Sequence, residues 1–471
     1  MPTSAAHAAQ QLPLLDLSEV SQAVQKKEVS PVTLTEACLS RIERLNPVLN
    51  AFITVTAESA LQEAREAEAA IARGEWRGPL HGIPLALKDL AETAGVRTTA
   101  GSKVLEHYVP SEDAEVVRRL RKAGAVLLGK LNLQEFAYGG SGIVSHYGPA
   151  RNPWNTAHIT GGSSSGSAAA VAAGLCYGAI GTDTAGSIRL PAACCGIAGL
   201  KPTYGLVSTR GIIPLSWSLD HVGPMARTVS DVALMLQAIA SYDPRDFYSQ
   251  KFPPVYYPSA LEEKRSGTRL GVAQEFFKQL DPEIEQAVER AIKVLSELTA
   301  DVLEITNLST ELDRTLVRSE PYVYHQRHLP AHEKQYHPET LRRIMTGADV
   351  TTPQYVEAYR EMLRRRREVL AVFDQVDLIV TPTTPFLPPS FAELEAAPDE
   401  LRAMELRLLR NTRPFNVYGL PAVSIPCGFS SSGLPIGLQI AGAPGAEGAV
   451  LALAHAYEKQ TQWHKRRPTM D

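Results

Sequence analysis

The sequence predicts an α/β fold, in which buried strands alternate with helices. Two short apolar runs, HGIPLALKDL (81–90) and AGAVLLGKLN (123–132), are bounded by Gly and Pro, as buried strands commonly are. The segment EDAEVVRRLRKAG (112–124) between them has the apolar spacing of an amphipathic helix. With 44% hydrophobic and 21% charged residues, the chain of 471 residues can bury a large core.

Helices are predicted for the first eighty residues. Ser30 and Pro31 form a suitable N-cap and first turn, and TLTEACLSRIERL (33–45) follows with Leu and Ile at helical spacing. A second amphipathic pattern runs through AESALQEAREAEAAIARGEW (57–76). Both patterns predict helices that precede the first strand.

The stretch from 151 to 227 is rich in Gly, Ser, Ala and Pro and carries few charges. Within it, AVAAGLCYGAIG (170–181) is apolar enough to pack in a core. Because a helix of Ala and Gly lets its neighbours approach closely, we place this stretch in the centre of the molecule.

Alternating elements return after residue 231. RLGVAQ (269–274) predicts a strand, and DPEIEQAVERAIKVLSEL (281–298) predicts a helix that Asp281 and Pro282 begin. Three later apolar runs predict short buried strands: VDLIVTPTTPFLPP (376–389), GLPAVSIPCG (419–428) and GLPIGLQIAG (433–442). No internal repeat or long linker divides the chain.

Charge and composition exclude several classes of protein. The net charge of −4 provides no polycationic surface for nucleic acid or anionic lipid. The one basic cluster, Arg364 to Arg367, lies in a helical pattern (354–373) and is interpreted as a solvated helix face. The longest apolar stretch, Ala168 to Ile180, is shorter than the roughly 20 residues that span a bilayer. The N-terminus lacks the basic start and apolar block of a secretion signal, and the five cysteines include no Cys-x-x-Cys pair. These features indicate a cytoplasmic protein with reduced thiols and no metal site.

The run GGSSSGS (161–167) allows several interpretations. A flexible linker is disfavoured because the run continues into the apolar Ala-rich stretch. A phosphate-binding loop has the spacing from Gly161 to Gly166, but Ser167 stands where that loop needs Lys. Residues 162–166 match the G-x-S-x-G nucleophile elbow, but the preceding RNPWNTAHIT reads as a loop and not as the strand the elbow needs.

A second serine offers a fourth possibility. In GTDTAGSIRLPAACCG (181–196), Ser187 follows a tight turn of small residues whose N–H groups could bind an oxyanion. Serine needs a base, and His158 and His221 are interpreted as structural or solvent-facing. Lys88 at the end of an apolar run is the better candidate, because burial disfavours its charged form. Lowering the pKa of a lysine from 10.4 to neutrality, by about three units, costs roughly 4 kcal/mol.

Together these segments resemble the amidase signature family. The resemblance rests on Lys88 in GIPLALKD, on the serine run and on the Ser187 segment, and it covers roughly 60–240 and 370–460. The remaining matching motifs are GKLNLQEFAYG, GIAGLKPTYG, SLDHVGPMARTVSD, FNVYGLPAVSIPCG and GLPIGLQIAG.

The resemblance implies a Ser–cis-Ser–Lys triad. Ser187 matches the nucleophile, Ser163 the bridging serine after a cis peptide bond, and Lys88 the base. The N–H groups of Thr184, Ala185, Gly186 and Ser187 are expected to form the oxyanion hole. The reaction is expected to pass through an acyl-enzyme on Ser187 without any metal or organic cofactor.

Further residues match other parts of the family pattern. Asp183 and Arg189 are expected to support the nucleophile turn. A loop bordering the substrate carbonyl is expected to bind substrate through Tyr138, Gly139, Gly140 and Ser141. The pocket itself is expected to be lined from the variable segments 319–347 and 381–415.

The resemblance also implies one domain, 1–471, built on a single large mixed sheet with helices on both faces and an N-terminal helical arm. We expect its parts to be an arm (1–60), a catalytic core (61–240), a variable region contributing to the pocket (241–370) and a C-terminal part of the core (371–471).

Three departures from the family pattern bear on the substrate. Ala185 stands where many relatives carry Gly, and Leu190 stands where the glutamine-hydrolysing chain of tRNA-dependent amidotransferases usually carries Gln. RLLRNTRP (407–414) lacks the acidic residue expected to grip the amino group of glutamine. We therefore expect a free-standing amide hydrolase, with side activity on anilides, esters or carbamates (urethanes). One alternative is the glutamine-hydrolysing subunit of a tRNA-dependent amidotransferase. The other is a non-catalytic binding module, which the retained triad disfavours.

The expected partners follow from the same evidence. We expect a small-molecule amide substrate, no nucleic acid and no membrane, with the chain acting as a monomer or homodimer.

Overall fold

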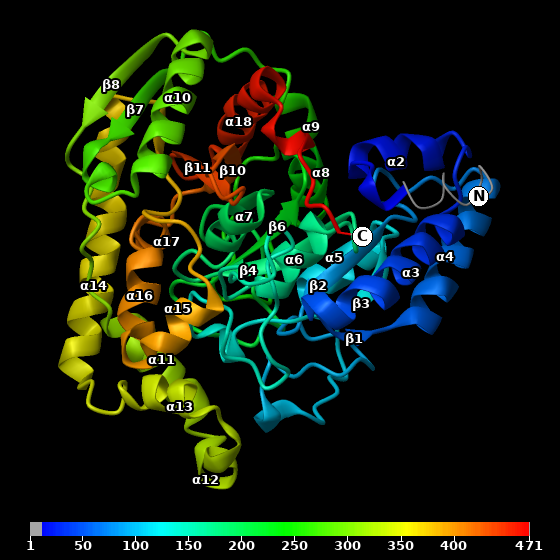
Figure 1. Ribbon diagram of the computed structural model, residues 1–471, viewed down its shortest axis with the longest axis horizontal. Helices are drawn as coiled ribbons and strands as arrows, with labels where there is room; N and C mark the ends of the chain where they lie inside the picture. The colour runs from blue at the N-terminus through cyan, green and yellow to red at the C-terminus, as the bar shows by residue number, and fades with distance from the viewer. Residues whose placement is uncertain (1–11, 471) are drawn as a thin grey trace.

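One eleven-stranded sheet forms the centre of the computed structural model, which describes residues 12–470. Its strand order is β1-β3-β2-β4-β6-β5-β10-β11-β9-β7-β8, and helices cover both of its faces (Figure 1). This arrangement confirms the predicted α/β fold with a single mixed sheet.

The strands are β1 (Phe52–Val55), β2 (Pro84–Lys88), β3 (Val126–Leu131), β4 (Gly178–Asp183), β5 (Ala198–Lys201), β6 (His221–Ala226), β7 (Arg269–Ala273), β8 (Asp301–Ile305), β9 (Leu378–Pro382), β10 (Ala422–Phe429) and β11 (Pro435–Gly442).

The α-helices are α2 (Leu17–Gln25), α3 (Pro31–Leu49), α4 (Ala57–Ala72), α5 (Glu115–Lys122), α6 (Ser165–Ala172), α7 (Arg189–Cys195), α8 (Val229–Ile239), α9 (Tyr257–Ala260), α10 (Pro282–Leu298), α11 (Thr315–His325), α12 (Leu329–His332), α13 (Pro338–Met345), α14 (Thr352–Glu368), α15 (Phe391–Ala396), α16 (Leu401–Leu408), α17 (Arg413–Val417) and α18 (Glu447–Thr461). The 3-10 helices are η1 (Leu12–Leu14), η2 (Lys103–Leu105), η3 (Glu135–Ala137), η4 (Gln274–Phe277), η5 (Glu333–Gln335), η6 (Val369–Asp374), η7 (Pro398–Glu400) and η8 (Trp463–Lys465).

Parallel and antiparallel pairs occupy different parts of the sheet. β2 runs parallel to β3 and β4 near one edge, and β7 runs parallel to β8 and β9 near the other. The strands between these groups, β6, β5, β10 and β11, pair with their neighbours antiparallel. The carboxyl ends of β2 and β4 lie together because these strands are parallel neighbours.

Helix starts follow the predicted capping residues. The Ser30 side chain accepts a hydrogen bond from the Thr33 N–H at 3.1 Å, and α3 begins at Pro31. The Asp281 side chain accepts from the Glu283 N–H in the same way, and α10 begins at Pro282. These caps confirm both helix predictions.

The first eighty residues contain a strand that the helical interpretation missed. β1 (FITV) separates α3 from α4 and pairs antiparallel with β3 at the sheet edge. Its Phe, Ile and Val favour an extended backbone, and four residues are too few to show a helical or alternating pattern. Residues 1–11 of the predicted arm lie outside the described residues.

The Ala-rich helix α6 is central, as predicted. Every one of its residues is buried, and it packs against β2, β3, β4 and β6. All five cysteines are buried free thiols. Within residues 12–470, no helix is long and apolar enough to cross a membrane.

The arginine run on α14 is only partly a solvated face. Arg364 is exposed and pairs with Glu361 and Glu368, as the prediction requires. Arg366 instead turns inward: it donates to the carbonyl oxygens of Val417 and Ser218 and lies over the Tyr204 ring at 4.2 Å. The prediction is wrong for this arginine, because one side of α14 packs on α17.

Candidate active site

The three predicted triad residues come from neighbouring parts of the sheet. Lys88 is the last residue of β2, Ser163 precedes α6, and Ser187 lies between β4 and α7. These elements lie together at the centre of the molecule (Figure 1). The peptide bond between Gly162 and Ser163 is cis, and Lys88 Nζ lies 2.7 Å from Ser163 Oγ.

The environment of Lys88 favours the neutral form of its amine. Its side chain is fully buried, and this burial lowers its pKa to about 7, although the charges of Asp183 and Asp220 oppose the shift. Its amine also donates to Thr182 Oγ1 at 2.8 Å. Sequence reasoning missed Thr182, because only the pairing of β2 with β4 brings it beside the lysine.

Ser187 lies next to the serine run. Its side chain is almost buried, at 5% exposure, and its carbonyl oxygen accepts from the Ser164 N–H at 3.3 Å. Within residues 12–470, no hydrogen bond joins the hydroxyls of Ser163 and Ser187. Catalytic hydrogen bonds commonly tighten only when substrate binds. The Lys88–Ser163 contact is therefore formed, and the Ser163–Ser187 contact stays a prediction.

The nucleophile turn offers three free N–H groups. Contrary to the predicted four-residue oxyanion hole, the Gly186 N–H is already donated to Asp183 Oδ1 at 2.7 Å. The N–H groups of Thr184, Ala185 and Ser187 have no partner among the described residues. Their binding of an oxyanion stays a prediction.

Asp183 and Arg189 form a buried ion pair behind the turn. Arg189 Nη2 and Asp183 Oδ1 are 2.9 Å apart, and both side chains are fully buried. Burial by itself raises the pKa of Asp183, but the charge and hydrogen bonds of Arg189 outweigh it and hold this pKa well below its usual range. Arg189 also donates to Gln439 Oε1 and Asn416 Oδ1, each at 2.7 Å. Both acceptors lie in matching motifs, FNVYGLPAVSIPCG and GLPIGLQIAG, but no local pattern in the sequence predicts their contact with Arg189.

The loop 138–141 is held between the catalytic run and α16. The Gly140 carbonyl oxygen accepts from the Gly162 N–H at 2.8 Å, and the Tyr138 carbonyl oxygen accepts from Arg343 Nη1 at 2.5 Å. Ser141 Oγ donates to Glu405 Oε1 at 2.6 Å. The loop of Tyr138, Gly139, Gly140 and Ser141 thus contacts the cis peptide through Gly140, and its contact with substrate stays a prediction.

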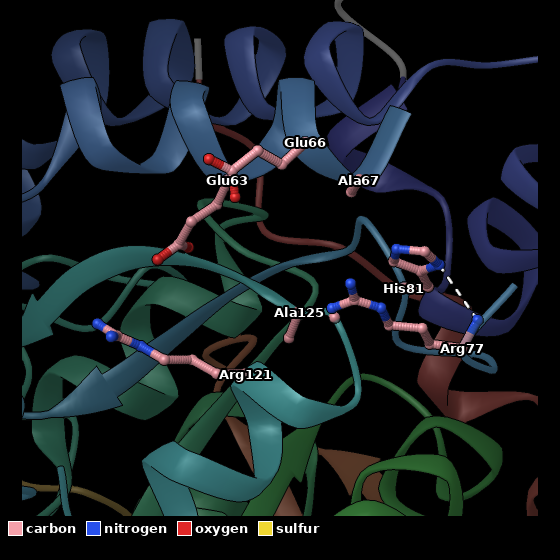
Figure 2. Close-up of a pocket in the computed structure, with 8 residues that line it drawn as sticks. Glu63, Glu66, Ala67, Arg77, His81, Arg121 and Ala125 are labelled. Atoms are coloured by element: carbon pink, nitrogen blue, oxygen red, sulfur yellow. Dashed lines mark hydrogen bonds between the residues drawn. The ribbon is translucent and has the colours of Figure 1, made fainter. Parts of the chain in front are cut away.

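A polar cavity of about 260 Å³ lies elsewhere, between α4 and the segments that lead into β2 and β3 (Figure 2). Two of its lining side chains have local partners: the Glu63 carboxylate accepts from the Leu127 N–H, and His81 Nδ1 accepts from the Arg77 N–H. None of the triad residues lines this cavity, so it is not the active site.

Comparison with known proteins places the chain in a family. A family model described as Amidase matches residues 33–451. The chain belongs to the amidase signature family. Members of this family cleave amide C–N bonds, so the coarse reaction class predicted from the sequence is confirmed.

Several relatives are similar over their whole length. The A-type subunit of glutamyl-tRNA(Gln) amidotransferase from Moorella thermoacetica is 44% identical over 97% of this chain and 98% of its own. The peptide amidase of Stenotrophomonas maltophilia is 35% identical, with a TM-score of 0.82 over 97% of this chain and 98% of its own. A 6-aminohexanoate cyclic dimer hydrolase is 31% identical, with a TM-score of 0.89 over 97% of this chain and 99% of its own.

The amidotransferase relatives overturn the predicted partners. The sequence predicted a small-molecule substrate, no nucleic acid and a monomer or homodimer, whereas these relatives are named as subunits of an enzyme of glutamyl-tRNA(Gln). That prediction is wrong because it was argued from net charge. Net charge describes a chain's own surface, and one member of an assembly need not itself carry the nucleic-acid contacts.

Proposed function

We propose that the chain hydrolyses a carboxylic amide through an acyl-enzyme on Ser187, as the amide-hydrolysing subunit of a tRNA-dependent amidotransferase with glutamine as the amide. The observation that carries this proposal is the end-to-end similarity to the A-type subunits of such amidotransferases, at 44% identity over 97% of the chain. The coverage of 98% of that relative leaves no large part of it unmatched.

The proposed mechanism balances its protons through the relay. Neutral Lys88 accepts the proton of Ser163 while Ser163 accepts the proton of Ser187, and Ser187 Oγ attacks the amide carbon. The N–H groups of Thr184, Ala185 and Ser187 hold the oxyanion. Lys88 then returns the proton through Ser163 to the leaving nitrogen, and ammonia departs. Water releases the acyl group from Ser187 by the same relay.

Glu405 is an acidic residue beside the predicted substrate loop. Sequence reasoning expected an acidic residue within 407–414 and found none. Glu405 lies one helical turn before Leu409 on α16, and its Oε1 accepts from Ser141 Oγ at 2.6 Å and from the Ser141 N–H at 3.2 Å. The same carboxylate pairs with Arg343 at 2.8 Å and with Arg402 at 3.2 Å, so these arginines neutralise its charge and it holds the loop in place.

The test is release of ammonia and glutamate from L-glutamine by the purified chain, with Ser187→Ala as the inactive control. In extract depleted of this chain, glutamine-dependent amidation of glutamyl-tRNA(Gln) should stop and should return when the wild-type chain is added back. Amidation that persists after depletion would exclude the amidotransferase role.

A second candidate function is hydrolysis of an amide with an apolar acyl group. Leu190 and Leu409 belong to an apolar cluster that includes Ala185 of the nucleophile turn. A panel of pentanamide with anilide, ester and carbamate analogues tests this candidate and the predicted side activities. Turnover of these compounds without turnover of glutamine would favour it over the first proposal.

The predicted cytoplasmic location stays a prediction, which fractionation of the source cells would test.

A further inference from the structure

The polar cavity of Figure 2, here called the α4 cavity, is lined by charges of both signs that do not pair with each other. Glu63 and Glu66 come from α4, whereas Arg77 and His81 come from the segment that leads into β2. Within residues 12–470, no carboxylate lies within 4.0 Å of the Arg77 guanidinium, and no basic nitrogen lies within 4.0 Å of either glutamate. The cavity therefore keeps acidic and basic groups apart.

Each glutamate has one carboxylate oxygen to spare. Glu63 Oε2 accepts from the Leu127 N–H at 2.8 Å, and Glu66 Oε1 accepts from Gln62 Nε2 at 2.8 Å. The second oxygens, Glu63 Oε1 and Glu66 Oε2, have no hydrogen-bond partner in the part of the chain that the structure describes. Burial raises the pKa of the Glu63 carboxyl, so a cation in the cavity would stabilise its charged form.

His81 provides a buried hydrogen-bond donor on the other side. It is 1% exposed, and its Nδ1 accepts from the Arg77 N–H at 3.2 Å. Burial, together with the charge of Arg77, lowers the pKa of His81, so the ring is neutral at pH 7 and carries its proton on Nε2. Figure 2 shows this second ring nitrogen turned toward α4 and away from the Arg77 N–H. Among residues 12–470 it has no hydrogen-bond partner, so the donor needs an acceptor inside the cavity.

The space between these groups is preformed. A Cβ on Gly124 would lie 2.4 Å from His81 Cδ2, and the φ of Gly124 is +80°, so glycine is needed for the ring to occupy this place. The Trp76 ring packs against His81 with 5.7 Å between centroids. Ala67 and Ala125 also line the cavity, and their short side chains leave its volume of about 260 Å³ open.

We propose that the α4 cavity binds a small zwitterion, with its carboxylate on Arg77 and His81 and its ammonium group on Glu63 and Glu66. An amino acid is the simplest ligand of this class. A ligand with both charges fits best because a single charge would satisfy only one side of the cavity. Guanidinium suits the carboxylate because it can donate two parallel hydrogen bonds. No triad residue lines this cavity, so the proposal goes beyond amide hydrolysis at Ser187 and does not depend on it.

The binding test uses five small probes and isothermal titration calorimetry on the full chain. L-Alanine, β-alanine and 4-aminobutanoate carry both charges at increasing separation, whereas propanoate and ethylamine carry one charge each. At least one zwitterion should bind at least about tenfold more tightly than either singly charged probe. Equal affinity for the singly charged probes, or no binding of any zwitterion, would overturn the proposal.

Substitutions then locate the binding. Arg77→Gln and Glu63→Gln should each weaken binding of the preferred zwitterion by about tenfold or more, because each removes a charge at one end of the ligand. Arg44→Gln on α3 and Glu68→Gln on α4 are the matched controls, since both residues are exposed and lie outside the cavity. Both controls should keep the wild-type affinity. Unchanged affinity in both cavity variants would place the ligand elsewhere and overturn the proposal.

A thermal measurement checks folding and binding together. A ligand that binds only the folded chain raises its Tm by mass action. The preferred zwitterion should raise the Tm of the wild-type chain and of both controls, and this rise should be lost in Arg77→Gln and Glu63→Gln. The Tm without ligand shows whether each variant is folded. An equal rise in all five chains would contradict binding in the α4 cavity.

Discussion

The pH dependence of activity follows from the burial of Lys88. Burial lowers its pKa from 10.5 to about 7. Each pKa unit corresponds to about 1.4 kcal/mol, so the shift of about three and a half units represents about 5 kcal/mol against the charged form. At pH 7 about half of the enzyme then carries a neutral Lys88, whereas an ordinary lysine would be neutral in roughly one molecule in 3000. Only the neutral amine can accept the proton of Ser163.

The assay is kcat/KM for a neutral amide between pH 5 and 9, since such a substrate does not titrate in this range. The rate should rise about tenfold between pH 6 and pH 8 and should level off above pH 8. The rate rises, and does not fall, with increasing pH because deprotonation of Lys88 creates the base. A rate already at its maximum at pH 5 would refute Lys88 as the base.

Asp220 provides the necessary control, because burial raises its pKa to about 7 as well. Its negative charge also raises the pKa of Lys88. Asp220→Asn removes that charge and keeps an acceptor for Thr184 Oγ1, which lies 2.5 Å away. The midpoint of the rise should therefore move to lower pH. Loss of the rise in this variant would assign the titration to Asp220 and not to Lys88.

Three further predictions follow from the buried contacts. Arg189→Met should lower the free energy of unfolding by about 3–5 kcal/mol in urea titrations, because it leaves Asp183 as a buried unpaired charge. A loss of stability below about 1 kcal/mol would contradict this reasoning. Gly139→Ala should sharply reduce both kcat/KM and Tm, since a Cβ there would lie 2.3–2.7 Å from polar side-chain atoms, and Gly267→Ala, where nothing lies within 4 Å, should change neither. Leu190→Gln replaces an apolar side chain of the cluster beside Ala185 with an amide. It should therefore raise the kcat/KM for glutamine relative to that for pentanamide. An unchanged ratio would show that this position does not contact the substrate.

The buried part of the fold could be predicted because it leaves local signals. β2 and β3 are buried along their whole length and, apart from Lys88 and Lys130, are built of apolar residues and Gly, so their positions can be read directly. β8 could not be predicted in this way, since four of its five residues are exposed on the edge of the sheet. An edge strand that buries almost nothing leaves no run of apolar residues in the sequence.

The candidate site was predictable only where its residues stand in contiguous motifs. Ser163, Ser187 and Lys88 were found through such motifs. Glu405 was not, because it reaches Ser141 across 264 positions and its own helix carries no family motif. Arg343 has the same origin, since no pattern within one segment indicates that it donates to the Tyr138 carbonyl oxygen.

The proposed catalytic groups and the residues that hold the predicted substrate loop come from different parts of the chain. The proposed catalytic groups come from β2, β4 and the loops beside them, whereas Arg343 and Glu405, which contact the loop 138–141, come from α13 and α16. Several contacts join the two parts, among them Ser141 Oγ on Glu405, Arg343 on the Tyr138 carbonyl oxygen and the Thr412 hydroxyl on Ala185. Substitutions between 314 and 408 can therefore change the accepted amide while Lys88 and Ser163 keep their contact. This separation explains how a peptide amidase and one chain of an amidotransferase can both resemble this protein from end to end. It also means that kcat/KM ratios between substrates, and not the presence of the triad, must decide which amide this protein uses.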